Sequence, residues 1–332
     1  MKMLVLSDAE VLELLPMKEC IAVMREALIA LATGKAHQPL RTIIRPPDAK
    51  GVMGLMPAYM STGIIDYQAA FGLKAICVFP GNPAKGKDAH QGAVLLFSAE
   101  TGELLAMMNA SAITAIRTAA VSGVATDLLA TPGACNLAII GSGVQARSHL
   151  RAISEVRSLK RCRIASRHFG HAQPFAEELR QEFSFALEPV ETIEAALDAA
   201  DLIVTATTAV EPIVKRQWIS AGAHLNVVGS STPKAREVDS ETMAAASLFV
   251  DRRESTINEA GDYLQAAHDG VIGQDHILAE IGEVLKGDKP GRTSPEEITL
   301  FKSLGIAIED LFAAEYLNRE AQKRNVGTWV SF

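Results

Sequence analysis

The chain has few cysteines and no run of like charge. Its 332 residues include only four cysteines, and these have no CxxC or paired spacing. A disulfide framework is therefore not expected, and the free thiols indicate a reducing environment. The net charge is -7, and the Lys and Arg residues are spread along the chain. This distribution excludes the basic face that a nucleic-acid-binding protein needs.

Long apolar runs and a leader segment are also missing. The N-terminal residues 1–8 lack the apolar stretch and cleavage site of a signal peptide. No apolar run approaches the roughly 18 residues that a membrane span requires. We therefore expect a cytoplasmic protein with no membrane and no nucleic acid among its partners. A hydrophobic content of 48% over this length is enough for two globular domains.

One stretch, residues 136–150, has the pattern of a dinucleotide-binding unit. The apolar run Leu137–Ile140 predicts a buried strand, and the residues after 146 have helical spacing. Glycines in the turn between them let the backbone approach a pyrophosphate, which would lie at the helix N-terminus. A glycine-rich turn needed only for packing is the alternative. The candidate cofactor ligands in this turn are Gly141, Ser142, Gly143, Val144, Gln145 and Ala146.

The context of this stretch favours the nucleotide-binding interpretation. Further strand-like runs alternate with helix-like segments, which is typical of a doubly wound parallel sheet. These runs are residues 161–166, 200–206, 223–228 and 247–251. Ahead of the stretch, helices are predicted within residues 7–34, where Ser7 and Glu10 form a capping box. An antiparallel or mixed sheet follows, with strands at 41–45, 51–56, 72–79, 92–97 and 104–108.

Three cations lie in or beside apolar segments ahead of the nucleotide unit. Lys74 interrupts an apolar strand, and Arg117 is the single charge of a small-residue helix at 111–125. A charge in such a setting must be paired or must face a wet cleft. Together with Arg45 at the end of another strand, they suggest a pocket for a carboxylate. For Arg117 the alternative is a side chain that snorkels at the helix edge.

The histidines do not predict a metal centre. His168 and His171 are three residues apart, but they follow a strand and no nearby carboxylates support ligation. No Ser-His-Asp arrangement can be argued from spacing. We expect no metal.

Several segments together resemble the ornithine cyclodeaminase/mu-crystallin family. They cover nearly the whole chain in order, which makes the resemblance specific. The segments are Gly54–Tyr59, Gly72–Lys74, Pro80–Pro83, Ile113–Ala120, Gly141–Ala146, Glu211–Ile213, Gly222–Gly229, Ala279–Gly287 and Thr299–Asp310.

The resemblance implies an α/β protein in which a Rossmann domain is inserted into an α+β substrate-binding and dimerisation domain. The expected parts are residues 1–118, the Rossmann domain 119–305, and a C-terminal helix 306–332 that returns to the first domain. It also implies a homodimer. Arg45, Lys74 and Arg117 would bind a substrate carboxylate, with Gln91 close to the junction of cofactor and substrate. We also expect the cofactor to contact Thr205, Val228, Gly229 and Ser303.

A departure from the family pattern narrows the expected activity. Members that cyclise ornithine carry an aspartate after the fifth Rossmann strand, and Ser231 stands at that position here. Deaminative cyclisation needs a base, and an unactivated serine is a poor one. Reduction of a ketimine needs only orientation, which a hydroxyl can provide by hydrogen bonding. The alternative is that Ser231 merely closes a loop.

The expected activity is therefore an NAD(P)H-dependent reduction of small α-imino acids, with Lys74, Arg117 and Ser231 as catalytic candidates. Alanine dehydrogenase or cyclodeaminase activity is the alternative, as is a catalytically vestigial nucleotide-binding protein. The strand at 161–166 ends without an acidic residue, and Ser166 and Arg167 can contact a 2′-phosphate. NADP(H) is thus the preferred cofactor, with NAD(H) as the other candidate. A solvated Arg167 without a ligand is the competing interpretation.

Overall fold

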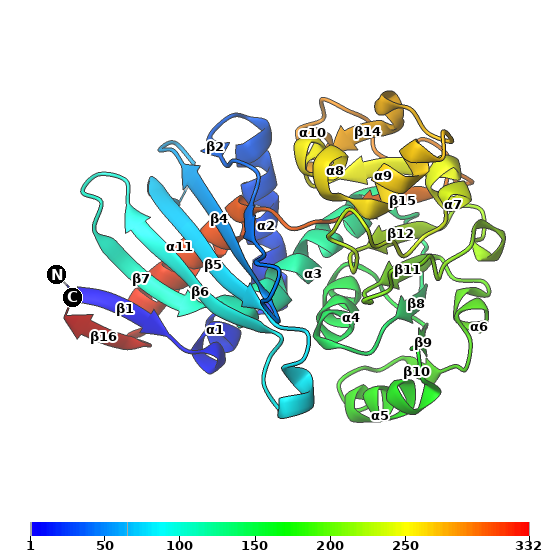
Figure 1. Cartoon of the computed structure of the whole chain (residues 1–332), viewed down its shortest axis with the longest axis horizontal. Coiled ribbons are helices and arrows are strands. Elements are labelled where there is room, and N and C mark those ends of the chain that lie inside the picture. The colour runs from blue at the N-terminus through cyan, green and yellow to red at the C-terminus, as the bar shows by residue number, and fades with distance from the viewer. Residues whose placement is uncertain (1, 65, 332) are drawn as a thin grey trace. The chain divides into compact units, whose positions relative to one another are not determined.

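A computed structural model describes residues 2–64 and 66–331, and the chain in it divides into two compact units. The first unit comprises residues 1–120 and 305–332, and the second comprises residues 121–304 (Figure 1). Helix α3 (Ala110–Leu129) runs through the first boundary. The sequence placed these boundaries at 118/119 and 305/306. The second unit is thus an insertion in the sequence of the first.

The first unit is built on one mixed sheet with the order β16-β1-β7-β6-β5-β4-β2, and β3 also pairs with β4. Most neighbours are antiparallel, but β1 and β7 are parallel. The short β2 and the terminal strands β1 and β16 were not predicted. The strands are β1 (Lys2–Leu6), β2 (Ala36–His37), β3 (Thr42–Ile44), β4 (Val52–Met60), β5 (Ala70–Val78), β6 (His90–Ser98), β7 (Leu104–Asn109) and β16 (Thr328–Ser331).

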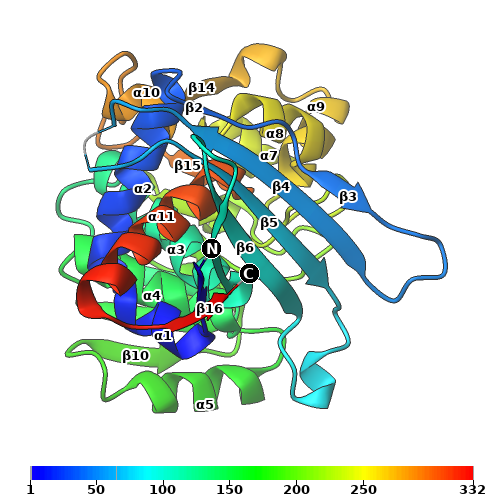
Figure 2. The ribbon, with the colours of Figure 1, turned by 90° about the vertical axis from the view of Figure 1, so that its left-hand side faces the viewer.

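One face of this sheet is covered by helices. In β5 the alternate residues Ala70, Gly72, Lys74 and Ile76 are buried, as the two-residue period of a strand requires. Helix α11 packs on this face and α2 packs on α11, and Figure 2 shows both on the same side of the sheet. The helices are α1 (Asp8–Leu14), α2 (Met17–Ala32), η1 (Pro83–Lys85, a 3-10 helix) and α11 (Ala307–Arg324).

Two local predictions can be compared with these helices. The capping box before α1 is confirmed, because Ser7 and Glu10 exchange both hydrogen bonds. Helix α11 was predicted to be amphipathic, but all residues from Ala307 to Glu315 are buried. Its first half lies between the sheet and α2, so it has no solvent-facing side there.

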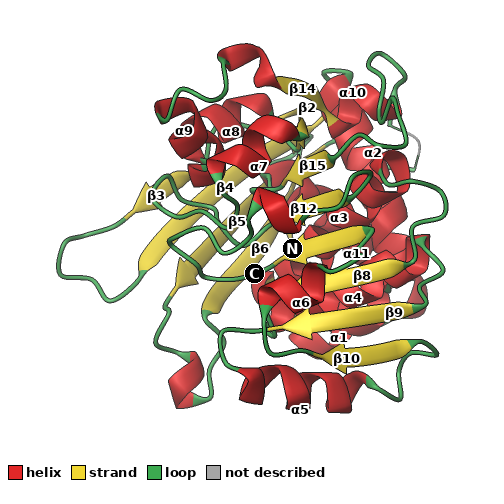
Figure 3. Cartoon of the chain, turned by 90° about the vertical axis from the view of Figure 1, so that its right-hand side faces the viewer, coloured by secondary structure: helices red, strands yellow, loops and turns green. Residues whose placement is uncertain are grey.

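The second unit is a wholly parallel sheet with the order β10-β9-β8-β11-β12-β15-β13-β14, most of which is visible in Figure 3. Its strands are β8 (Asn136–Ile140), β9 (Arg161–Ala165), β10 (Ala186–Pro189), β11 (Leu202–Thr205), β12 (His224–Val227), β13 (Ser247–Val250), β14 (Ile277–Glu280) and β15 (Thr299–Lys302). Its helices are α4 (Val144–Val156), α5 (Phe169–Leu179), α6 (Ile193–Leu197), η2 (Arg216–Trp218), α7 (Ser240–Ala245), α8 (Arg253–Glu259), α9 (Gly261–His268), η3 (Gln274–His276) and α10 (Ile281–Leu285).

The apolar strands of this sheet are buried on both faces, which explains why they read as continuous hydrophobic runs. In β8, Ala138 and Ile140 belong to one core cluster, whereas Leu137 and Ile139 belong to another. The predicted fold class is therefore confirmed: a Rossmann-like parallel unit is inserted into a unit with a mixed sheet.

The strand order reverses direction between β8 and β11. Chain order runs outward from β8 to β9 and β10, and then returns to β11 on the other side. In open parallel sheets, ligands bind at such a switch point, outside the carboxyl ends of the strands. The residues that follow β8, β11, β12 and β15 are therefore the ones to examine.

Helix α3 has the length and apolar composition of a membrane span. However, 78% of its most apolar window is buried inside the structure. This is the behaviour of the core helix of a soluble protein, and the small side chains of α3 fit that position.

Candidate functional site

The turn after β8 has the geometry of a phosphate-binding turn. Gly141 has φ +129°, and an added Cβ would lie 2.5 Å from the carbonyl oxygen of Ala206, so only glycine fits. Gly143 caps α4, and an added Cβ there would meet nothing within 4 Å. Val144, the first residue of α4, is 62% exposed. Open space thus adjoins the N-terminus of a 13-residue helix, where backbone N–H groups and the helix dipole favour an anion.

The end of β9 reaches this turn. The hydroxyl oxygens of Ser142 and Ser166 lie 3.0 Å apart. Arg167 is exposed, and its guanidinium donates a long hydrogen bond of 3.5 Å to the hydroxyl of Thr208. Ser166 and Arg167 therefore lie where a dinucleotide-binding unit reads the ribose, and Arg167 is free to turn toward a phosphate. Ala146 is fully buried, as a close contact between α4 and the sheet requires.

The other predicted cofactor residues lie at the carboxyl ends of three neighbouring strands. Thr205 ends β11, Val228 and Gly229 follow β12, and Ser303 follows β15. Thr205 and Ser303 are almost fully buried, and the hydroxyl of Thr205 donates to Glu237 at 2.8 Å. They belong to the correct edge of the sheet, but Thr205 already has a partner within the protein.

That partner, Glu237, was missed by the sequence analysis. Its buried carboxylate accepts from the backbone N–H and hydroxyl of Thr207, the hydroxyl of Thr205 and the backbone N–H of Gly229, at 2.7 to 2.8 Å. Burial raises the pKa of the Glu237 carboxyl, whereas nearby Lys302 and the hydroxyl donors act in the opposite direction. In the sequence it stands in a polar loop and resembles a solvated surface acid.

A second buried pair lies beside Glu237. Lys302, in β15, contacts Asp262 of α9 at 2.9 Å and donates to the carbonyl oxygen of Ser230 at 2.6 Å. Asp262 in turn accepts from the backbone N–H groups of Glu237 and Val238. These contacts tie both ends of the loop 230–236, which carries the exposed Ser231.

In the first unit, Lys74 and Arg117 lie together and are buried, each only 3% exposed. Lys74 Nζ is 2.7 Å from Asp310, Arg117 Nε is 3.0 Å from the same carboxylate, and Arg117 Nη1 is 2.6 Å from Glu309. The two acids stand in the first turn of α11, where the helix dipole favours negative charge. Gly305 leaves room for the guanidinium, since an added Cβ would lie 2.8 Å from Nη2.

This arrangement corrects one of the two interpretations of Arg117. A snorkelling side chain would carry its charge to water, whereas this guanidinium is buried and paired with acids. The contacts with Glu309 and Asp310 use Nε and Nη1 but not Nη2. Two of the three Lys74 donors are likewise not needed for Asp310. Donors for a further carboxylate are therefore present on both cations.

The charges of this cluster shift each other's pKa values. Burial and the charge of Arg117 lower the pKa of Lys74 to about 8, while Asp310 opposes the shift. Burial alone would lower the pKa of Arg117, but Asp310 and Glu309 reverse this and raise it. Burial, together with Lys74 and Arg117, lowers the pKa of His90. Burial raises the pKa of Cys20. Lys74 is therefore the group of this set that titrates just above neutrality.

Arg45 and Gln91 are placed differently. Arg45 follows the short strand β3 and is exposed. Gln91 is exposed in β6, donates to the carbonyl oxygen of Asp88 at 3.1 Å, and pairs with Cys77 in β5. Because Lys74 is three residues from Cys77, Gln91 points to the opposite face of the sheet from Lys74. Among the described contacts, none joins either residue to the Lys74 cluster, and their predicted roles stay predictions.

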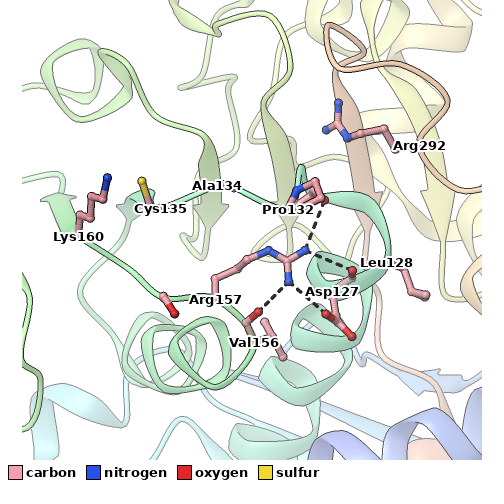
Figure 4. A pocket seen from close by; sticks show the side chains of 12 residues that line it. Asp127, Leu128, Pro132, Ala134, Cys135, Val156, Arg157, Lys160 and Arg292 are labelled. Atoms are coloured by element: carbon pink, nitrogen blue, oxygen red, sulfur yellow. Dashed lines mark hydrogen bonds and ion pairs between the residues drawn. The ribbon is translucent and has the colours of Figure 1, made fainter.

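The best-formed cavity of the second unit lies elsewhere. It has a volume of about 700 Å³ and is lined by residues that include Cys135, just before β8, and Arg157, just after α4 (Figure 4). It is therefore at the amino end of β8, away from the glycine turn. Arg157 donates to the carbonyl oxygens of Thr126 and Asp127 near the end of α3, and Arg292 donates to that of Leu129. These cations cap a helix, which explains their presence without a ligand.

No group of three or more His, Cys, Asp or Glu side chains able to hold a metal ion occurs in residues 2–64 and 66–331.

The chain was compared with known proteins. The profile of the ornithine cyclodeaminase/mu-crystallin family matches residues 1–325. The Mus musculus protein named ketimine reductase mu-crystallin is 40% identical over 282 residues, which are 85% of this chain and 84% of that protein. The structure of Thermococcus litoralis Delta(1)-pyrroline-2-carboxylate reductase in complex with NADH and L-proline is 40% identical, has a TM-score of 0.94, and covers 98% of this chain and 99% of its own. An archaeal alanine dehydrogenase dimer with bound NAD is 34% identical, has a TM-score of 0.92, and covers 100% of both chains.

The buried ion pairs lead to a prediction about stability. Asp310→Asn leaves Lys74 and Arg117 with one carboxylate between them, and removing one partner of a buried charge network costs about 3–5 kcal/mol. Asp288→Asn is the matched control, because Asp288 pairs with Lys286 on the surface, where the cost is below about 1 kcal/mol. Denaturant unfolding of both variants measures the difference. Equal free energies of unfolding for the two variants would show that the buried pairs do not stabilise the unit.

Proposed function

The chain belongs to the ornithine cyclodeaminase/mu-crystallin family, and from this membership we propose that it is an NAD(P)H-dependent reductase of small α-imino acids. The substrates are cyclic ketimines such as piperideine-2-carboxylate or pyrroline-2-carboxylate, and the products are the cyclic amino acids. The similarity to the Thermococcus litoralis reductase carries this proposal, because that protein was solved with NADH and L-proline and matches 98% of this chain. L-Proline is what reduction of the C=N bond of pyrroline-2-carboxylate yields.

The glycine turn and α4 fit a dinucleotide. Gly141 allows the tight turn, and the open space beside Gly143 lets a pyrophosphate approach the N-terminus of α4. The bound cofactor supplies a hydride equivalent to the imine carbon. Ser166 and Arg167 hold the 2′-phosphate of NADP(H), which makes it the preferred cofactor over NAD(H). No acidic side chain stands before Glu177 to repel that phosphate.

Lys74 and Arg117 bind the substrate carboxylate through the donors that Glu309 and Asp310 leave available. Because the two acids already neutralise the two cations, the carboxylate is held by directed hydrogen bonds, which fix the orientation of the imine. Arg45 and Gln91 are the further substrate contacts in this proposal. A protonated imine is already an electrophile, so the protein has only to position it and exclude water.

Ser231 orients the substrate by a hydrogen bond and does not act as a base. It is exposed in the loop 230–236, with no partner among the described side chains that would activate its hydroxyl. Cyclisation of ornithine requires a base that survives several proton transfers, and a serine hydroxyl does not meet this need. Cyclodeaminase and alanine dehydrogenase activities are therefore the alternatives, as is a protein that only binds the nucleotide.

We also propose that the chain forms a homodimer through the face of the mixed sheet that no helix covers, with the first unit serving substrate binding and dimerisation. That face carries Phe71 and Met107, which are 49% and 37% exposed, and Phe71 contacts Tyr59 at a ring distance of 4.8 Å. Exposed apolar patches of this kind mark protein interfaces. A second copy of the chain is the occupant, since the similar alanine dehydrogenase is a dimer. The enzyme works in the cytoplasm. Sedimentation equilibrium that gave a monomer at micromolar concentration would contradict the dimer.

The first functional test is turnover. Purified protein with NADPH is given pyrroline-2-carboxylate, piperideine-2-carboxylate, pyruvate with ammonia, or no substrate, and NADPH oxidation is followed. We expect turnover with the cyclic imines. In parallel, ornithine with NAD should release no ammonia, because Ser231 offers no base. Sustained ammonia release would favour the cyclodeaminase, and turnover confined to pyruvate with ammonia would favour the alanine dehydrogenase. Tight NADPH binding without any turnover would indicate a binding protein.

A second prediction concerns pH. Lys74 must be protonated to hold a carboxylate, and its pKa is lowered from 10.5 to about 8. Binding of pyrrole-2-carboxylate, whose ring nitrogen does not titrate in this range, should be constant below pH 8 and weaken as pH rises through that pKa. Lys74→Arg keeps its charge and should abolish the effect. Asp310→Asn should move it to lower pH, because the carboxylate raises the pKa of Lys74. Affinity that stays constant to high pH in the unmutated enzyme would argue against this role of Lys74.

A third prediction concerns the choice of cofactor. KM for NADPH should lie below KM for NADH by about 10- to 100-fold, the value of one charge-assisted contact. Arg167→Ala should narrow the gap, chiefly by weakening NADPH, and rising salt should do the same. Arg180→Ala is the control, since Arg180 is an exposed cation that pairs with Glu177. Equal KM values in the unmutated enzyme, or a full preference in Arg167→Ala, would refute this placement of the 2′-phosphate.

A further inference from the structure

The Glu237 carboxylate is a point where separate strand ends meet. Oε1 accepts from the backbone N–H of Thr207, and Oε2 accepts from the backbone N–H of Gly229. Thr207 follows β11 and Gly229 follows β12. Hydroxyl groups of Thr207 and Thr205 complete the set, one on each oxygen. The four donors thus connect the ends of two adjacent parallel strands through one side chain.

The packing around this carboxylate leaves no space for a different arrangement. An added Cβ on Gly229 would lie 2.5 Å from Glu237 Oε1. Gly229 is therefore a glycine because the carboxylate and the Thr207 backbone approach it so closely. The glycine at this position, predicted as a cofactor contact, is explained by Glu237 in the absence of any ligand.

The same side chain closes the loop 230–236. Gly229 precedes that loop and Glu237 ends it, so their hydrogen bond joins its two ends. Lys302 adds a second tie through the carbonyl oxygen of Ser230. Ser231 therefore stands on a loop whose base is fixed by buried charged groups, although the residue itself is exposed.

These strand ends adjoin the switch point of the sheet. The carbonyl oxygen of Ala206, directly after β11, is the atom that forces Gly141 of the phosphate turn to be glycine. The phosphate turn and the β11 end therefore touch, and a dinucleotide that starts on α4 continues across the ends of β11 and β12. The nicotinamide half would then lie over the residues that Glu237 connects.

We propose that Glu237 is a positioning residue that holds the ends of β11 and β12 and the Ser231 loop in the arrangement that receives the nicotinamide half of the cofactor. This rests on the proposed function. Glu237 itself contacts no reactant, because it is fully buried and its carboxylate oxygens already accept from four donors.

Glu237→Gln tests the proposal with almost no change in shape. Each carboxylate oxygen faces a backbone N–H, which can only donate. Whichever way the glutamine amide is turned, its NH2 group opposes either Thr207 or Gly229, so one strand end must move. Glu241→Gln is the control, because Glu241 is exposed at the start of α7 and the substitution removes the same charge.

Two ligands separate a positioning role from general damage. The fragment 2′,5′-ADP occupies only the adenosine half at α4 and β9, whereas NADPH also requires the nicotinamide half. In Glu237→Gln we expect unchanged affinity for 2′,5′-ADP, an NADPH affinity about 10- to 100-fold weaker, and a lower kcat. Glu241→Gln should match the unmutated enzyme in all three. Unchanged NADPH affinity and kcat in Glu237→Gln would overturn the proposal, as would an equal loss for both ligands.

A milder variant keeps the test valid if Glu237→Gln does not fold. Thr205→Val removes one hydroxyl donor from a buried site and keeps the carboxylate and both backbone contacts. It should give the same pattern with a smaller effect on NADPH. An unmutated protein that binds neither 2′,5′-ADP nor NADPH would instead contradict the proposed function, so the two failures are distinguishable.

Discussion

The ion pairs of Lys74 and Arg117 with Glu309 and Asp310 close a unit whose sequence is split by an insertion. Arg117 and Asp310 are 193 residues apart, yet they are in direct contact in the core. Two cations buried this deeply would unfold the unit if they were unpaired, and the acids at the start of α11 provide the pairing when the chain returns from the second unit. The first unit is therefore complete only when the C-terminal helix has docked.

The second unit contains a buried charged cluster of the same kind. Glu237, Asp262 and Lys302 come from a loop, a helix and a strand, and their contacts end mostly on backbone groups that follow the strands. A parallel sheet leaves backbone N–H and C=O groups unpaired where its strands stop, and buried groups of this kind need partners. Charged side chains meet this need and also fix where the loops leave the sheet. The residues that shape the carboxyl edge are thus different from those that would touch a ligand there.

The sequence was informative where the determinants are local. The turn Gly141–Ala146 combines a strand, two glycines and a helix start within a few residues, and its geometry followed directly. Lys74 and Arg117 stood out because charges in apolar segments need partners, but nothing local identifies Glu309 and Asp310 as those partners. Glu237 could not be recognised, since its donors Thr205, Thr207 and Gly229 lie in loops joined only by the fold. The strand β10 is short and ends in a proline, and β1 and β16 are defined by pairing between the two ends of the unit rather than by their own patterns.

The neutral charge of the Lys74 cluster also limits what it can bind. A pair of uncompensated buried cations would attract any anion, including inorganic phosphate, and would discriminate poorly. With Glu309 and Asp310 in place, an incoming carboxylate gains little from net charge and must match the remaining donors of Lys74 and Arg117 in position. The acids thereby exchange raw affinity for selectivity toward a planar carboxylate with a fixed orientation. For imine reduction this matters more than tight binding, because the rate depends on holding the C=N carbon at the correct distance and angle to the hydride donor.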